Sequence, residues 1–414
     1  MTGTAPRSGI LSFLAQNRNW LAAGALLTFL SSFGQTFFIS VFAAEIRADF
    51  NLSHGEWGGI YSLGTTAAAA VMVWAGGLTD TFRARQLGAW VLGMLALACV
   101  AMAINPYALL LPVVIFALRL TGQGMTSHIA IVAMARWFVA TRGRALAVAT
   151  LGFSIGEAIL PMTFVALMTV FEWRSLWGVV AVIALAGIPV LMLLLRSERT
   201  PQSMAEENQS LGMAGRHWTR RETLTHGLFW MMVPALAGLS AFGTAFFFHQ
   251  AYYAEIKGWT HLSLVAFFPV YTTVGIVAMV LSGMALDRFG TARLMPLYQV
   301  PMVVAFGIFA TAETLLGVAL GLVFFAMTAG ANSTLPNAFW AEFYGTRHIG
   351  SIKALAAAVM VLGSAIGPGI TGVLIDAGVD LPMQYMGVSV YFLCASLCMW
   401  IGINRARRTL SVAT

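Results

Sequence analysis

The sequence predicts an all-α membrane protein in which twelve transmembrane helices form two six-helix bundles. First, 59% of the 414 residues are hydrophobic and only 9% are charged, whereas soluble domains carry ~25% charged residues. Second, apolar runs such as 20–44 and 176–195 match the ~20 residues that cross a ~30 Å hydrocarbon core as a helix. Third, the two halves of the chain repeat each other. A transmembrane barrel is not expected, because its strands would alternate apolar and polar residues.

Short loops separate the predicted spans, except for one long polar segment at residues 196–226. This segment contains Pro201, Glu206 and a basic end, and we expect it to be a cytoplasmic linker between an N-terminal bundle, residues 1–195, and a C-terminal bundle, residues 227–414. The twelve spans are expected at residues 20–44, 55–77, 86–105, 108–135, 144–171, 174–195, 228–254, 262–286, 294–311, 315–340, 349–374 and 383–403.

The basic residues are distributed unevenly between the two sides of the membrane. The net charge is +7; if both termini are cytoplasmic, the loops on that side hold nineteen of the 23 Lys and Arg residues, the opposite loops hold three, and Arg119 lies within a span. Such a bias is typical of cytoplasmic loops. We therefore expect a multi-pass protein of a bacterial-type inner (plasma) membrane with both termini cytoplasmic, and no nucleic acid partner.

Internal repetition supports the division into two bundles. Four short patterns recur at spacings of 205 to 209 residues. The pairs are Phe33-Gly34 with Phe242-Gly243, Ser53-His54 with Thr260-His261, Gly76-x-x-x-Asp80 with Gly283-x-x-x-Asp287, and Thr141-Arg142 with Thr346-Arg347. A parallel repeat of six helices is common in transporters, whose binding site lies at the interface of the repeats near mid-membrane.

The sequence shows no sign of enzymatic chemistry. It contains no Gly-rich phosphate loop, metal-ligand cluster or catalytic triad. Cys99, Cys394 and Cys398 lie in predicted spans without metal-ligand spacing, so we interpret them as small core residues. We expect no cofactor, no bound metal and no ATP-driven step.

Loop motifs carry a family resemblance. Gly76-Gly77-Leu78-Thr79-Asp80, followed by Arg83 and Arg85, is echoed by the run from Gly283 to Gly290, which includes Asp287 and Arg288. With the twelve spans and the central linker, these motifs resemble the loop signature of the major facilitator superfamily over essentially the whole chain. The resemblance implies the major facilitator fold and transport of a small solute.

Two further motifs resemble helix signatures of that superfamily. Arg119 with the following Gly122-Gln123-Gly124 is similar to the fourth-helix signature, and Gly152-x-x-x-Gly156 is similar to the fifth-helix one. Glu157 stands where many antiporters of the superfamily have proline, so this motif does not establish antiport. The stretches 135–138 and 142–145 resemble, more narrowly, the oxalate/formate and monocarboxylate branch.

Arg119 is the principal candidate for substrate binding and coupling. It precedes Arg136 by 17 residues, which places it about 25 Å from the cytoplasmic end of its helix. An arginine within a span is costly and is functional by default. In a regular helix Gln123 and Thr126 share its face, whereas His128 does not. The alternative is a structural ion pair.

Glu157 is the candidate for proton coupling. It lies at a comparable depth, about 20 Å from the same side, so it is able to meet Arg119 across neighbouring helices. If the two pair, Glu157 carries protons only when substrate competes for the arginine; if they do not, it is itself a plausible proton carrier. The alternative is a fixed pair that locks two helices.

Four other polar residues within or at the ends of spans are candidates for lining the binding cavity, and seven charged residues at the cytoplasmic ends are candidates for gating. The lining candidates are Gln35, His249, Tyr271 and Asn332, for which interhelical hydrogen bonds are the alternative. By the family resemblance, gating is assigned to Asp80, Arg136, Arg142, Arg144, Asp287, Arg288 and Arg347, for which solvated loop residues are the alternative.

These observations predict a secondary active transporter that moves a small organic anion of monocarboxylate type by alternating access. Protons or a counter-anion would be the coupled species, and the protein is expected to be a monomer in the lipid bilayer. A second hypothesis is proton-coupled export of hydrophobic or amphipathic compounds, for which the 22 Met and 28 Phe residues are suited. A receptor or scaffold without transport is disfavoured, because a scaffold need not place arginine within the membrane.

Overall fold

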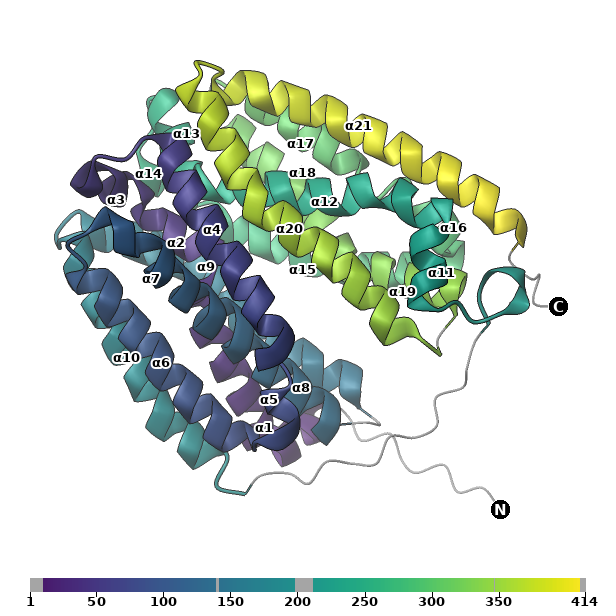
Figure 1. Ribbon diagram of the computed structural model, residues 1–414, viewed down its shortest axis with the longest axis horizontal. Coiled ribbons are helices and arrows are strands. Elements are labelled where there is room, and N and C mark those ends of the chain that lie inside the picture. Colours follow the sequence, from purple (N-terminus) through teal and green to yellow (C-terminus); the bar gives the residue numbers. More distant parts are fainter. Residues whose placement is uncertain (1–9, 139–140, 198–210, 346, 410–414) are drawn as a thin grey trace. The chain divides into compact units, whose positions relative to one another are not determined.

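The computed structural model describes residues 10–138, 141–197, 211–345 and 347–409, and every regular element in these ranges is a helix (Figure 1). Among the described residues, ten helices are long and apolar enough to cross a membrane, one bent pair counts as an eleventh span, and the shorter apolar helix Val300–Thr311 lies at the predicted ninth span. This arrangement confirms the predicted all-α fold class with twelve transmembrane helices.

The helices up to the predicted linker follow the predicted spans within a few residues, apart from the first. They are α1 (Ile10–Leu30), η1 (Ser31–Gly34), α2 (Thr36–Ile39), η2 (Ser40–Phe42), α3 (Ala43–Phe50), α4 (His54–Ala75), α5 (Leu78–Thr81), α6 (Ala84–Ile104), η3 (Ala108–Leu110), α7 (Leu111–Leu118), η4 (Arg119–Thr126), α8 (Ser127–Trp137), α9 (Arg142–Met168) and α10 (Trp173–Leu194).

The helices after the linker show breaks in several predicted spans, at His249, at residues 333–334 and ahead of Val300. They are η5 (Met213–Gly215), α11 (Arg220–Thr225), α12 (Gly227–Phe248), α13 (Gln250–Ile256), α14 (His261–Val265), α15 (Phe268–Phe289), α16 (Thr291–Leu294), α17 (Val300–Thr311), α18 (Leu315–Asn332), α19 (Leu335–Tyr344), α20 (Ile349–Asp376), α21 (Leu381–Ala406) and η6 (Arg407–Thr409).

The first span is not the single helix predicted at 20–44. It runs from Ser12 to Gly34, breaks at Gln35, and continues from Thr36 to Phe50 after a bend of 49°. Gln35 has an extended backbone with φ −84° and ψ 154°, which interrupts the helical hydrogen bonds. A break in a membrane span leaves backbone N–H and C=O groups without helical partners. Such a break is tolerated only where it lines a water-filled cavity or is buried in protein.

The described chain separates into two compact units of contacting helices. The division into bundles at 1–195 and 227–414 stays a prediction. Among the described residues, unit 1 contains 10–35, 67–138, 141–156 and 171–197, and unit 2 contains 36–66, 157–170, 211–345 and 347–409. The boundary therefore falls within α4 and α9. Unit 2 includes segments of the first, second and fifth spans, which pack against helices of the second half of the sequence.

Unit 1 is built on two helix pairs that are visible in Figure 1. α6 packs along α10, and α1 packs along α8 and the wide turn η4. Glycines allow the closest approaches: a Cβ at Gly152 of α9 would lie within 2.4 Å of the Thr28 hydroxyl on α1. Small residues at such crossings are typical of helix packing in membranes.

One hydrophobic core of unit 2 lies between α12, α19, α20 and α21, around Met232, Phe339 and Met399. α15 packs along α18, where a Cβ at Gly330 would lie within 2.9 Å of the Ala278 side chain. The last part of the predicted linker is folded rather than extended, because the Trp218 amide donates to the Tyr344 carbonyl at 3.0 Å. A capping box between Thr219 and Glu222 begins α11.

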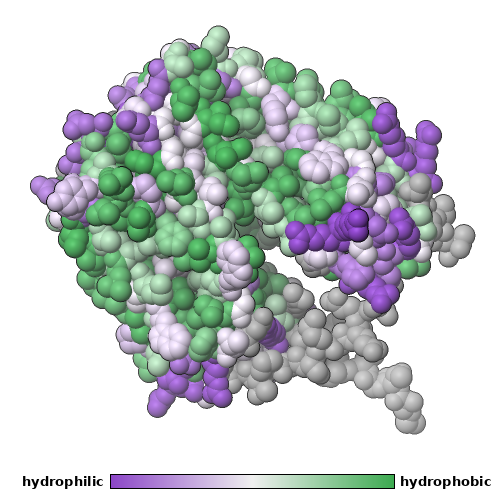
Figure 2. Space-filling model, in the orientation of Figure 1, coloured by the Kyte–Doolittle hydropathy of each residue, from purple (hydrophilic) through white to green (hydrophobic). Residues whose placement is uncertain are grey.

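The surface is what a multi-pass membrane protein requires. Figure 2 shows hydrophobic side chains over much of the visible helical surface, with hydrophilic ones gathered near helix ends. Leu97 is 69% exposed and Leu316 is 78% exposed. Exposed apolar areas of this extent mark contact with lipid. The chain is therefore an integral membrane protein, as the sequence predicts.

Candidate functional site

Arg119 lies at the start of a wide turn in the fourth span. In η4 the backbone bonds reach five residues instead of four, an arrangement that is frequent at functional sites. The Arg119 side chain is only 3% exposed, and its Nη1 donates to the Gly34 carbonyl at 3.1 Å. A guanidinium has five N–H donors, so it can hold this carbonyl and a carboxylate at the same time.

Two glycines set the position of Arg119. A Cβ at Gly34 would lie 2.3 Å from the Leu118 carbonyl oxygen, and a Cβ at Gly122 would lie 2.6 Å from the Gly34 Cα. The first and fourth spans therefore cross with their backbones in contact. This crossing brings the Gly34 carbonyl, immediately before the break at Gln35, within reach of the guanidinium.

Gln35 and Gln123 are both half-buried, and both lie next to the glycine crossing in unit 1. The wide turn changes the face predicted for the residues after Arg119, since the prediction assumed 3.6 residues per turn. Thr126 is fully buried and its hydroxyl donates to the Thr121 carbonyl at 2.6 Å. It serves the helix itself, whereas the backbones of Gln35 and Gln123 lie beside Gly34, whose carbonyl accepts from Arg119.

Glu157 belongs to unit 2, where it meets the eighth span. The Thr272 hydroxyl donates to Glu157 Oε2 at 3.2 Å, and the Glu157 side chain is half-buried. Thr272 is itself 7% exposed. A buried hydroxyl beside a carboxylate within a span provides an adjustable hydrogen-bond partner, because a hydroxyl both donates and accepts. Pairing of Glu157 with Arg119 stays a prediction.

Tyr271 and Asn332 have different surroundings in unit 2. The buried Tyr271 ring meets the rings of Phe247 and Phe325 edge to face, at centroid distances of 5.4 and 5.5 Å. Asn332 ends α18 and its Oδ1 accepts from the Tyr298 hydroxyl at 3.4 Å. Tyr271 adjoins Thr272 and thus Glu157, whereas Asn332 contacts the ninth span.

His249 lies in the break between α12 and α13. It is 3% exposed, and its Nε2 lies 3.1 Å from the Pro368 carbonyl of α20. Its ring is 6.0 Å from the ring of His54, at the start of α4. The next residue, Gln250, donates through Nε2 to the Ser40 hydroxyl at 3.0 Å. These contacts join the first, seventh and eleventh spans within unit 2.

Asp376, at the end of α20, is a residue that the sequence reasoning missed. Its Oδ1 accepts from the His54 amide at 3.1 Å and its Oδ2 from the Gly55 amide at 2.7 Å, so it caps the N-terminus of α4. Just below this cap, a Cβ at Gly372 would lie 2.3 Å from the His54 carbonyl. The only sequence signal was an acidic residue ending a span, because its partner lies 321 residues away.

The predicted gating residues lie at helix ends, and their network stays a prediction. Arg136 donates through Nη1 to the Thr79 carbonyl at 2.7 Å, and the Arg288 guanidinium lies 5.4 Å from the Phe289 ring centroid. The side chains of Asp80 and Arg142 lie outside the described residues. The remaining members, Arg144, Asp287 and Arg347, are exposed.

Comparisons with known proteins agree with this architecture. The chain resembles a bacterial homolog of the human lysosomal transporter Spinster in an inward-facing and unoccupied conformation, with 14% identity, a TM-score of 0.71 and full coverage of both chains. It also resembles the nucleoside transporter NupG, with 13% identity and a TM-score of 0.72 over 93% of this chain and 99% of that one. At such identities the similarity establishes the fold. No curated protein matched the sequence.

The fold and the sequence family together identify a membrane transporter, not an enzyme. The sequence model described as Major Facilitator Superfamily matches residues 24–368. The chain therefore belongs to the Major Facilitator Superfamily, and the predicted family is confirmed. The narrower oxalate/formate and monocarboxylate branch stays a prediction.

Proposed function

We propose that this transporter moves a small organic anion of monocarboxylate type by alternating access, coupled to protons or to exchange of a second anion. The observation that carries the proposal is the buried Arg119 of the fourth span, which donates a hydrogen bond to the Gly34 carbonyl beside the break in the first span. A positive charge inside the membrane is retained where it serves a substrate or ion pathway. The charge bias of the loops supports an inner-membrane orientation with both termini cytoplasmic.

The neighbours of Arg119 suit a small carboxylate. Gln35, which follows Gly34, and Gln123, whose backbone adjoins Gly34, would supply amide donors and acceptors near the guanidinium that donates to the Gly34 carbonyl. Planar guanidinium groups bind carboxylates with two parallel hydrogen bonds. A site with one fixed cation and two neutral amides favours a monoanion over a dianion, because the second negative charge would remain uncompensated in a medium of low dielectric constant.

Glu157 is suited to couple protons to transport. When it is ionised, Glu157 accepts the Thr272 hydrogen bond; when it is protonated, the hydroxyl can reverse and accept the proton of the carboxyl group. The pair thus has a hydrogen bond in either protonation state. This property allows proton uptake without leaving an unsatisfied polar group in the membrane.

The contacts at one end of unit 2 support alternating access. Residues of the first and second spans meet the seventh and eleventh there, through Gln250 with Ser40 and through Asp376 with the start of α4. These segments come from both predicted bundles, 1–195 and 227–414. We infer that this cluster closes the outer side of the pathway and separates when the two bundles rock.

One observation favours the second hypothesis, export of hydrophobic or amphipathic compounds. Tyr271, which adjoins Thr272, lies against Phe247 and Phe325. Aromatic rings bind apolar and cationic ligands. The two hypotheses differ in which charged residue contacts the solute: Arg119 for an anion, and Glu157 for a cationic amphipath.

The proposal is tested with purified protein in proteoliposomes that carry a pH gradient. Arg119→Gln should abolish uptake of labelled formate, lactate and related monocarboxylates, with a loss of at least about 100-fold expected for a hydrogen-bonded charge pair. Arg293→Gln, the same change at an exposed helix end, should keep uptake within about twofold. Thermal unfolding of both variants verifies that they are folded.

The outcomes separate the two hypotheses. Unchanged uptake of every monocarboxylate in Arg119→Gln would contradict the anion site. Proton-driven efflux of an amphipathic cation that survives Arg119→Gln but not Glu157→Gln would support the exporter instead.

A further inference from the structure

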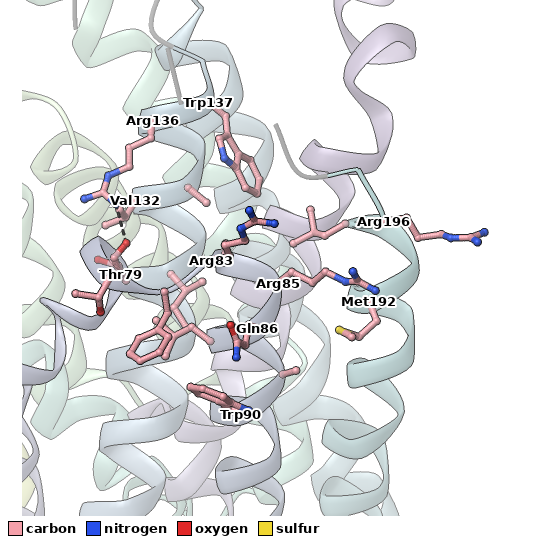
Figure 3. Close-up of a pocket in the computed structure, with 18 residues that line it drawn as sticks. Thr79, Arg83, Arg85, Gln86, Trp90, Val132, Arg136, Trp137, Met192 and Arg196 are labelled. Carbon is pink, nitrogen blue, oxygen red and sulfur yellow. Dashed lines mark hydrogen bonds between the residues drawn. The ribbon is translucent and has the colours of Figure 1, made fainter. Parts of the chain in front are cut away.

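A cavity of about 710 Å³ opens at the end of unit 1 that the charge bias places in the cytoplasm. Its walls come from the segment after α4, the first turns of α6, the end of α8 and the end of α10. Figure 3 shows Arg83 and Arg85 projecting between these helix ends, with Arg136 turned toward Thr79. The volume is typical of small-molecule sites.

The described lining is strongly basic. It includes the four arginines Arg83, Arg85, Arg136 and Arg196, and no aspartate or glutamate among the residues that the structure describes. The side chains of Arg83, Arg85 and Arg196 make no hydrogen bond or ion pair with a described residue, and the Arg85 Nε is buried without a hydrogen-bond partner. A buried N–H donor of this kind is costly unless a ligand or water satisfies it.

Aromatic and apolar residues continue from the cavity along the lipid-facing side of α6. Trp90 lines the cavity and is 50% exposed, and Met94, Leu97 and Ile104 follow it at helical spacing with still larger exposed fractions. Tryptophan is enriched at the level of lipid headgroups. A ligand with an anionic head group would bind the arginines of the cavity, and its acyl chain would cover the exposed apolar side chains of α6.

We propose that this cavity binds a phosphate group through Arg83 and Arg85, and that the phosphate belongs to an anionic phospholipid of the surrounding leaflet. Arginine matches phosphate oxygens with paired hydrogen bonds. Basic cavities between transmembrane helices on the cytoplasmic side are suited to anionic headgroups. Arg136 donates to the Thr79 carbonyl, which orients the wall that faces the headgroup. A soluble phosphate ester has the same charge, but it lacks the chain that would cover the α6 stripe.

Native mass spectrometry of the purified, delipidated full-length protein tests this proposal. The probes are phosphatidylglycerol, phosphatidylcholine and glycerol 3-phosphate, which separate an anionic lipid, a zwitterionic lipid and a soluble phosphate ester. We expect the wild-type protein to bind phosphatidylglycerol about tenfold more tightly than phosphatidylcholine. Arg83→Gln/Arg85→Gln should remove that preference, since each arginine near an anionic surface contributes about fivefold in affinity.

Arg220→Gln/Arg221→Gln is the matched control, because it removes the same charge from exposed residues of the predicted cytoplasmic linker. It should keep the preference. Equal loss in this control, or an unchanged preference in Arg83→Gln/Arg85→Gln, would overturn the site. Glycerol 3-phosphate that displaces phosphatidylglycerol at comparable concentration would assign the cavity to a soluble ester and overturn the lipid assignment. Should the double variant be unstable, Arg85→Gln alone should lower affinity about fivefold.

Discussion

Arg119 and Glu157 are both charged residues inside the membrane, but the protein holds them in different ways. Backbone contacts position Arg119. Two glycines bring the first and fourth spans into contact, and the Gly34 main-chain carbonyl accepts a hydrogen bond from the guanidinium. Glu157 is held by the side-chain hydroxyl of Thr272. The first arrangement has little freedom to change, whereas the second can reorient with a single rotation.

Under the proposed function, this difference corresponds to a division of tasks. A residue that must present a constant charge to a substrate benefits from a rigid support, because preorganised groups lose less entropy on binding. A residue that must gain and lose a proton benefits from a partner that both donates and accepts. We therefore expect changes near Arg119 to affect binding and folding together, and changes near Glu157 to affect coupling alone.

Among changes to the residues that support Arg119 and Glu157, the largest effect is expected from Gly122→Ala. Its Cβ would meet backbone atoms of Gly34 at 2.6 and 2.7 Å, so the two spans must separate. Overpacking of this kind costs about 1–3 kcal/mol, and a displaced Arg119 should lower uptake by at least about tenfold. Thermal unfolding and proteoliposome uptake measure the two effects.

Gly93→Ala on α6 is the control, because nothing lies within 4 Å of its Cβ position. Alanine there should leave uptake unchanged and stabilise the helix slightly, by up to about 1 kcal/mol. If Gly122→Ala transports as well as Gly93→Ala does, the rigid support of Arg119 is not needed for function.

The spans were predictable from sequence because each one buries its own backbone hydrogen bonds and must be apolar along its length. The sixth span illustrates this, since residues 174–195 were expected and Trp173–Leu194 is observed. The break at Gln35 was not predictable, because hydropathy averages over a window and a single extended residue leaves no trace in it. The wide turn at Arg119 was not predictable for a similar reason, because assigning residues to helix faces assumes a constant number of residues per turn.

The candidate site was predictable in part. A charged residue within an apolar run is a candidate for function, and this signal identified Arg119 and Glu157. Their partners were not identifiable, because Gly34 and Thr272 lie 85 and 115 residues away and are ordinary residues for a span. Which residues meet across helices depends on packing geometry, and a single sequence does not encode that locally.

An intermediate effect is expected from Thr272→Val, which removes the hydroxyl and keeps the shape of the side chain. Proton-driven uptake should fall about three- to tenfold, as expected for loss of a hydrogen bond to a carboxylate, while exchange of anion across the membrane without a pH gradient continues. Thr273→Val is the matched control, since Thr273 is exposed and donates to the Pro269 carbonyl. Equal losses in exchange and proton-driven uptake would show that Thr272 supports the structure and not the coupling.

The smallest effect is expected at His226, a titratable residue outside the membrane that belongs to neither site. Its ring lies 4.7 Å from the Trp218 ring and 6.1 Å from the Tyr344 ring. Burial, and to a smaller extent the charge of Arg216, lowers the pKa of His226 below its usual value of 6.5. The unfolded chain therefore binds a proton at a pH where the folded protein does not, and stability falls as pH drops below 6.5.

Because His226 is only half-buried, the melting temperature should fall by no more than about 1–2 °C between pH 7 and pH 5. His226→Phe keeps an aromatic ring and should remove that decrease, whereas His348→Phe at an exposed helix end should not. Neither variant should alter the pH dependence of uptake, which we assign to Glu157 and Thr272. A changed uptake profile in His226→Phe would place the pH sensitivity outside the membrane, and the contrast between a fixed arginine and a titrating glutamate would then no longer explain coupling.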